Sequence, residues 1–203
     1  MRVLVACEFS GIVRDAFLAR GHDAWSCDLL PTERERERHY QGDVMDIINY
    51  GWDMMIAHPP CTYLSYAGTR QWNAPGRIKK RLEALEFFRI LWESPINKIC
   101  IENPKGCASP IIAKFTQEIQ PYYWGDNEMK TTWLWLKNLP QLGYSIDDGL
   151  FHKKTGIDRP EPIKRRMVAG KMKNYYYTEK TRNPYERARF WPGIAKAMAE
   201  QWG

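Results

Sequence analysis

Long apolar runs are missing from this chain of 203 residues. A membrane-spanning helix needs about 20 consecutive apolar residues, and no stretch approaches that length. The first residues, Met1–Val5, are typical of a short strand and lack the charged start and apolar segment of a signal peptide. We therefore expect a soluble, cytoplasmic protein without a membrane partner.

Cysteine clusters are missing as well. The chain has five cysteines, which form no CxxC pair and no group with histidine. Structural zinc needs such groups, and a disulfide framework needs paired cysteines. An odd number of scattered cysteines is typical of reduced thiols in a reducing compartment. The sequence therefore predicts no metal site and no disulfide among Cys7, Cys27, Cys61, Cys100 and Cys107.

Glycine is scarce in the turn that follows the first predicted strand. Cys7–Gly11 contains one glycine and no GxGxxG motif, which disfavours a dinucleotide, because its pyrophosphate needs close approach to the backbone. A nucleoside ligand without phosphate fits better. Asp28 lies about twenty residues after this turn, where a carboxylate accepts hydrogen bonds from a ribose. A turn-capping role is the alternative for both Asp28 and Asp43.

Positive charge is present but unevenly distributed. The formal net charge is +6, whereas residues 151–191 hold twelve lysines and arginines against four acidic residues. This segment is also rich in aromatic side chains, and cations interleaved with aromatics suit phosphate contacts and base stacking. A solvated, partly flexible loop is the alternative. The aromatic residues are Phe151, Tyr175, Tyr176, Tyr177, Tyr185, Phe190 and Trp191.

Short apolar strands alternate with amphipathic helices along the chain. This alternation predicts an α/β fold with a doubly wound, mostly parallel sheet. We expect strands at residues 2–6, 22–27, 54–57, 98–101 and 130–136, and helices at residues 10–20, 78–93 and 193–202. Residues 31–39 alternate in charge and predict a solvated loop. The predicted apolar face of the second helix comprises Ile78, Leu82, Leu85, Phe88 and Trp92.

The composition predicts one domain with a short elaboration. A hydrophobic content of 44% is enough to bury a core of ordinary size. We expect a main domain over residues 1–145 and a basic, aromatic-rich C-terminal elaboration over residues 146–203 that packs on it.

An apolar strand runs directly into Pro59-Pro60-Cys61. Two prolines fix φ and exclude a helix, so the chain leaves the sheet in one direction. Open α/β sheets place their sites at the carboxyl ends of the strands. We therefore expect Cys61 to belong to a site, with an inert core cysteine as the alternative.

Five short motifs then follow one another in order. They read Phe9-Ser10-Gly11, Cys27-Asp28-Leu29, Gly42-Asp43-Val44, Pro59-Pro60-Cys61 and Ile101-Glu102-Asn103-Pro104. Over residues 1–140 this series resembles the cytosine-C5 DNA methyltransferase family, in particular its small phage and prophage versions, which lack a large target-recognition domain. The specific part of the match is Pro-Pro-Cys together with Glu-Asn, because both lie at predicted strand ends.

The resemblance implies a Rossmann-like enzyme of a prokaryotic or phage-infected cell. It would transfer a methyl group from S-adenosylmethionine to C5 of cytosine in DNA and release S-adenosylhomocysteine. Cys61 would add to C6 of a flipped-out base, Glu102 would assist at N3, and Lys130 would replace the family's later pair of arginines. The implied donor-binding residues are Phe9, Ser10, Gly11, Asp28, Leu29, Asp43, Val44 and Pro59.

The chain also departs from the family pattern. His58 stands where the family has a small residue, and we expect a structural role for it. Few residues follow the strand at 130–136, so target recognition falls to the basic segment, to a homodimer or to a partner protein. RNA or a free pyrimidine nucleotide as substrate, and an inactive fold that binds nucleic acid or protein, are alternatives. Methylation of amino groups is disfavoured, because those enzymes need an aromatic residue where Cys61 stands.

Overall fold

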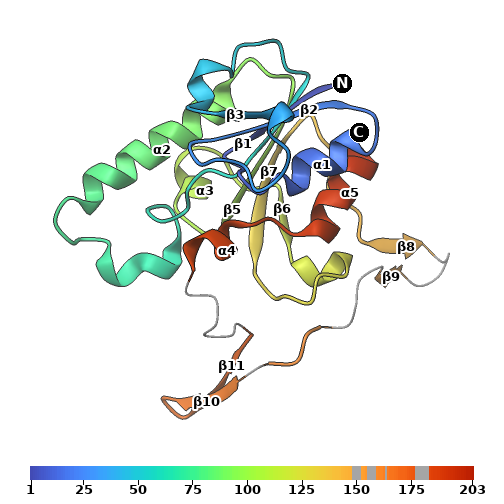
Figure 1. The fold of residues 1–203 in the computed structure, drawn as a ribbon. Coiled ribbons are helices and arrows are strands. Elements are labelled where there is room, and N and C mark those ends of the chain that lie inside the picture. Colours follow the sequence, from blue (N-terminus) through green and yellow to red (C-terminus); the bar gives the residue numbers. More distant parts are fainter. Residues whose placement is uncertain (148–151, 155–158, 163, 177–182) are drawn as a thin grey trace.

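A computed structural model describes residues 1–147, 152–154, 159–162, 164–176 and 183–203. Its centre is a seven-stranded sheet in the order β3-β2-β1-β4-β5-β7-β6 (Figure 1). Strands β1 to β5 are parallel, whereas β7 is antiparallel to β5 and β6. The strands are β1 Arg2–Ala6, β2 Asp23–Asp28, β3 His39–Gln41, β4 Met54–Ala57, β5 Lys98–Pro104, β6 Gln117–Ile119 and β7 Thr132–Lys137.

Helices cover both faces of this sheet (Figure 1). On one face, α1 (Ile12–Leu18) and α5 (Pro192–Trp202) pack in a core that includes Val3 and Val5 of β1. On the other face, α2 (Arg77–Glu93) and α3 (Ala108–Ile111) share a core with Leu4 and Ala6 of the same strand. This alternation is typical of a central strand buried on both sides. The predicted doubly wound α/β fold is confirmed.

The remaining elements are short. The 3-10 helices are η1 Arg36–Arg38, η2 Val44–Asp46, η3 Tyr66–Gln71 and η4 Pro121–Trp124, and α4 is Pro184–Ala188. Outside the main sheet, β8 (Ser145–Asp147) pairs with β9 (His152–Lys154), and β10 (Lys164–Val168) pairs with β11 (Lys171–Tyr175). None of the described helices is long and apolar enough to cross a bilayer.

Two strands of the main sheet lie where the sequence predicts none, as do the four described strands outside it, β8 to β11. Residues 31–39 were expected to be a loop, but η1 and the start of β3 lie there, and β3 pairs in parallel with β2. The other additional strand of the main sheet is β6, which pairs with β7. Strands β3 and β6 have three residues each, too few for a periodic apolar pattern to be recognised.

The predicted apolar face of α2 is wrong in its first turns. Ile78 and Leu82 are 58% and 62% exposed, whereas Leu85, Phe88 and Leu91 are buried. The first turns pack through Arg77 and Arg81 instead, whose guanidinium groups lie 4.9 and 4.1 Å from the ring centroids of Tyr63 and Trp72.

The C-terminal helix belongs to the main core. Ile194, Met198 and Trp202 of α5 are buried in the same cluster as Val13 and Phe17 of α1. Phe190 and Trp191 are buried with them, although the sequence offers them as stacking aromatics. Whether a domain boundary lies at residue 145 stays a prediction, and Phe151 and Tyr177 lie outside the described residues.

Candidate active site at the carboxyl ends of the parallel strands

The Pro-Pro-Cys loop is fixed to its neighbours on both sides. The His58 amide donates to the carbonyl oxygen of Ala6 in β1, at 2.9 Å. On the other side, the buried Asn103 side chain of β5 donates through Nδ2 to the carbonyl oxygen of Pro59, at 2.7 Å. The Glu-Asn dipeptide therefore has a structural partner in the loop that presents Cys61.

The chain after Cys61 is fastened to the segment after β5. The amides of Leu64 and Ser65 donate to the Cys61 carbonyl oxygen at 3.1 and 2.9 Å, and the Cys107 amide donates to the Leu64 carbonyl oxygen at 2.9 Å. A Cβ atom on Gly106 would lie 2.3 Å from that same carbonyl oxygen. Glycine is required there because the two backbones approach so closely.

Cys61 itself is exposed and surrounded by charges of both signs. The protein atoms around the thiol, followed by the negative charge of Glu102, raise its pKa above the usual value. Lys130 and Arg187 oppose this shift and lower the thiol pKa. The structure thus brings the three predicted catalytic residues, Cys61, Glu102 and Lys130, within electrostatic reach of one another.

His58 contacts the Glu102 carboxylate directly. The distance from His58 Nδ1 to Glu102 Oε2 is 3.4 Å, and both side chains are largely buried. The imidazole also packs against the ring of Phe190, with 4.5 Å between the ring centroids. Its Nε2 atom is buried with no hydrogen-bond partner among the described residues. His58 is therefore placed to orient Glu102, and the structural role expected for it stays a prediction.

A cavity of about 270 Å³ opens at the ends of β1, β2 and β3, and we call it the strand-end cavity. Four of the eight predicted donor-binding residues line it, namely Asp28, Leu29, Asp43 and Val44. Asp43 follows β3, so the unpredicted strand explains why its carboxylate reaches this edge of the sheet. The other lining residues are Cys7, Cys27, Gly42, Pro60 and Phe87.

Both acidic residues of this cavity also cap turns. Asp28 accepts a hydrogen bond from the Leu30 amide at 2.9 Å, and Asp43 accepts one from the Met45 amide at 3.0 Å. Burial raises the pKa of Asp28, because charge is costly where water is excluded. Burial together with these nearby carboxylates raises the pKa of Cys27 to about 12, so its thiol stays protonated.

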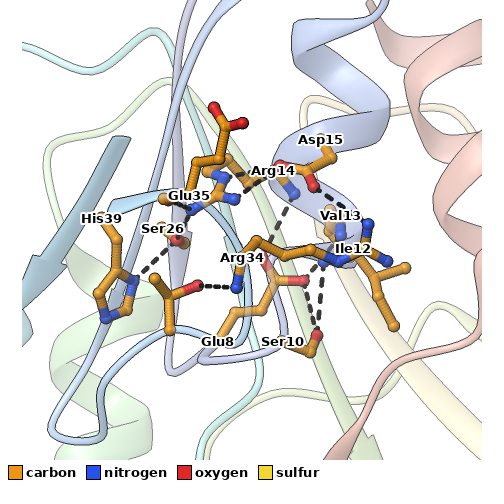
Figure 2. Close-up of polar contacts among 11 residues, drawn as sticks. Glu8, Ser10, Ile12, Val13, Arg14, Asp15, Ser26, Arg34, Glu35 and His39 are labelled. Atoms are coloured by element: carbon orange, nitrogen blue, oxygen red, sulfur yellow. Dashed lines mark hydrogen bonds and ion pairs between the residues drawn. The ribbon is translucent and has the colours of Figure 1, made fainter. Parts of the chain in front are cut away.

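The first turn is closed by side chains of the chain itself (Figure 2). The buried Glu8 carboxylate accepts hydrogen bonds from the amides of Val13 and Arg14, at 2.7 and 3.2 Å, at the start of α1. Burial raises the pKa of Glu8. A Cβ atom on Gly11 would meet both Arg14 Nη2 and Arg34 Cγ at 2.8 Å. The predicted donor-binding residues Phe9, Ser10 and Gly11 are therefore buried outside the lining of the strand-end cavity, as is Pro59.

A second cavity, of about 780 Å³, lies between the segment before β7 and the C-terminal chain. We call it the C-terminal cavity. Lys130, Arg187 and Trp191 are among its lining residues, and the Lys130 ammonium lies 4.6 Å from the centroid of the Trp191 ring. Trp191 is fixed by a 2.7 Å hydrogen bond from its Nε1 to Glu128. Cys61 is not among the lining residues of either cavity, but Lys130 and Arg187 are close enough to its thiol to lower the thiol pKa.

Sequence reasoning missed several residues of the site. Cys7 and Phe87 line the strand-end cavity, and Glu8 caps α1, but nothing in their spacing marks them. Cys7 directly follows β1 and has a positive φ of 59°, which non-glycine residues seldom adopt. That conformation is visible only in the structure.

Comparison with solved structures finds similar chains at low sequence identity. One is encoded within a prophage of E. coli and described as a DNA modification methyltransferase; it is 16% identical, with a TM-score of 0.44, and 79% of this chain and 52% of that one are covered. Another is the Dnmt2 methyltransferase of S. pombe, 17% identical with a TM-score of 0.43, over 73% and 52%. The chain thus spans about half the length of each. No family model matches it, and no curated protein matches its sequence.

Proposed function

We propose that this chain transfers a methyl group from S-adenosylmethionine to C5 of cytosine in DNA. The observation that carries the proposal is the position of Cys61. Its thiol is exposed after a central parallel strand, on a loop fixed by Asn103, with Glu102 and Lys130 close enough to shift its pKa. A cysteine with a packing role alone needs neither a fixed loop nor charged side chains that shift its pKa.

The proposed chemistry uses the thiol and the carboxyl together. Cytosine C5 is a poor nucleophile, and addition of a thiolate to C6 creates an enamine that is reactive at C5. The Cys61 sulfur forms a bond to C6, the ring electrons shift towards N3, and N3 takes a proton from the Glu102 carboxyl. After the methyl group has bonded to C5, the C5 proton leaves to a base. The Sγ–C6 bond then breaks, the sulfur leaves as a thiolate, and N3 returns its proton to Glu102, which restores the aromatic ring.

The strand-end cavity suits the nucleoside part of the methyl donor. Carboxylates such as Asp28 and Asp43 accept hydrogen bonds from ribose hydroxyls and from an adenine amino group, while Leu29 and Val44 offer apolar contacts. When bound, S-adenosylmethionine supplies the methyl group. A volume of about 270 Å³ is near the lower limit for a small-molecule site. The methionine end would therefore extend towards Pro59 and the first turn, where Phe9, Ser10 and Gly11 remain predicted contacts.

The C-terminal cavity suits the target base. C6 of cytosine is inaccessible in a stacked duplex, so the base must leave the helix at a cost of roughly a few kcal/mol. Lys130 of this cavity acts on the Cys61 thiol, and Trp191 gives the cavity an aromatic wall. Lys130 and Arg187 would contact the phosphates beside the base, although three acidic residues, Asp126, Glu128 and Glu186, line the same cavity.

The experiment incubates the protein with methyl-labelled S-adenosylmethionine and, separately, duplex DNA, single-stranded DNA and RNA. Each polymer is then digested to nucleosides for mass spectrometry. We expect labelled 5-methylcytosine from DNA, lost in Cys61→Ala and retained in the matched control Cys107→Ala, whose thiol is buried whereas that of Cys61 is exposed.

Other outcomes contradict parts of the proposal. Label on an exocyclic nitrogen would refute the role of Cys61, and label on RNA alone would refute the choice of DNA. No label on any polymer, with a folded protein that binds the methyl donor, would favour a free pyrimidine nucleotide as substrate. No label together with no donor binding would favour a fold that only binds nucleic acid or protein.

A further inference from the structure

The hairpin formed by β10 and β11 has two unlike faces. The strands pair antiparallel, from Lys164 opposite Tyr175 to Val168 opposite Lys171. Ala169 and Gly170 form the two-residue turn, with φ values of 48° and 74°. Positive φ at both positions is typical of the tight turns that join two strands of a twisted ribbon.

One face of this ribbon is cationic. Side chains alternate along a strand, and residues directly opposite each other share a face. Lys164, Arg166, Lys171 and Lys173 therefore lie together on one face, with Val168, and all four cationic side chains are exposed. We call these four residues the cationic face. It contains no acidic residue.

The opposite face is electrically neutral and partly apolar. Arg165 pairs with Glu161 at 3.1 Å, and Met167 lies opposite Met172, with exposures of 60% and 58%. By contrast, no residue of the cationic face forms an ion pair with any residue that the structure describes. The cations of the described hairpin that have no acidic partner thus all lie on one face.

This arrangement works against the hairpin when it is free. Arg166 and Lys173 are directly opposite each other, and like charges in that position destabilise a strand pair. An isolated two-stranded hairpin is also only marginally stable in water. In Figure 1 the hairpin lies apart from the main sheet, so no packing against the core offsets the repulsion. A polyanion bound to the cationic face would neutralise these side chains and so remove the repulsion between them.

We propose that the cationic face of β10 and β11 binds the major groove of double-stranded DNA. The B-form major groove, about 12 Å wide, admits a two-stranded ribbon, and phosphates line both its edges. The major groove of an RNA duplex is too deep and narrow for one. The inference rests on the proposed function in taking DNA as the polyanion, and it assigns duplex binding to an element outside both cavities.

The test measures binding of the full chain to a short fluorescent DNA duplex over a range of salt concentrations. One variant replaces all four residues of the cationic face by glutamine. The matched control replaces four exposed cations of the main body, Arg20, Lys79, Lys114 and Lys196, by glutamine, and so loses the same charge. Removing the repulsion between Arg166 and Lys173 favours the hairpin, so a loss of binding by the first variant is not explained by its unfolding.

We expect the cationic-face variant to bind the duplex about 10²–10³-fold more weakly at physiological salt, with a salt dependence reduced by about 3–4 in log–log slope. The control should retain most of its affinity and slope. Equal losses in the two variants would overturn the proposal, because net charge alone would then explain binding. Tighter binding of an RNA duplex through the same four residues would overturn the choice of DNA.

The binding assay and the methyl-transfer assay, both on the protein with Cys61 intact, together separate this inference from the proposed function. Duplex binding that depends on the cationic face, in a protein without methyl transfer, would refute the function and leave the hairpin proposal standing. Methyl transfer to DNA with unchanged KM in the cationic-face variant would refute the hairpin proposal and leave the function standing.

Discussion

At the residue scale, the Cys61 thiol is held between opposing charges. Glu102 raises its pKa, and Lys130 lowers it. Neutralising Glu102 removes a negative charge that disfavours the thiolate, so Glu102→Gln should lower the thiol pKa and speed alkylation at any fixed pH below it. Lys130→Gln should raise the pKa and slow alkylation. The measurement is the rate of iodoacetamide modification at Cys61 against pH, followed by peptide mass spectrometry.

The control for this prediction is Glu83→Gln, an exposed carboxylate on α2 that does not act on the thiol. In this control, the rate of iodoacetamide modification at Cys61 should depend on pH as it does in the protein without substitutions. Shifts of the same sign in Glu102→Gln and Lys130→Gln would show that at least one of the two charges does not act on Cys61 as described.

Part of the site was predictable residue by residue. Asp28 was found because it follows a predicted strand, and Asp43 because it belongs to the Gly-Asp motif of the resemblance; both line the strand-end cavity. Phe87 was not found, because it follows no strand and reaches the cavity only through the packing of α2. The burial of Gly11 against Arg14 and Arg34 depends on side-chain placement that no spacing rule describes.

At the element scale, the link between Asn103 and Pro59 couples β5 to the loop after β4. Asn103→Ala leaves the buried Pro59 carbonyl oxygen without its donor, which should lower the free energy of unfolding by about 1–3 kcal/mol. Urea denaturation gives this value, and Asn73→Ala, at an exposed position, is the matched control. An Asn103→Ala protein as stable as the control would contradict the idea that this bond fixes the loop.

Element lengths decided which parts of the fold the sequence could predict. Strands β1, β2, β4 and β5 have apolar residues in sufficient number to be recognised, and they set the parallel core of the sheet. The short strand β3 is bracketed by charged residues and is ordered by pairing with β2. Long-range pairing of this kind leaves no local pattern.

At the scale of the whole molecule, the last helix completes the core of the N-terminal half. Trp202 is 3% exposed, and its Nε1 donates to the carbonyl oxygen of Pro140 at 3.0 Å. Trp202→Ala should therefore cost about 3–5 kcal/mol in the free energy of unfolding. Thermal and urea unfolding measure this loss, with Lys196→Ala on the exposed side of the same helix as control. Equal stability of the two variants would mean that α5 is not part of the cooperative core.

The central claim is that Cys61 forms a covalent bond to C6 of cytosine. Its most direct test is the intact mass of the protein after incubation with S-adenosylmethionine and a DNA duplex in which every cytosine is 5-fluorocytosine. Release of the enzyme requires loss of the C5 proton. A fluorine atom at C5 cannot leave as a proton does, so the bond between Cys61 and C6 persists. We predict a protein–DNA adduct whose crosslinked peptide contains Cys61 and which is absent in Cys61→Ser. Transfer of methyl groups to C5 of ordinary cytosine without any adduct at Cys61, or an adduct at another residue, would contradict the account.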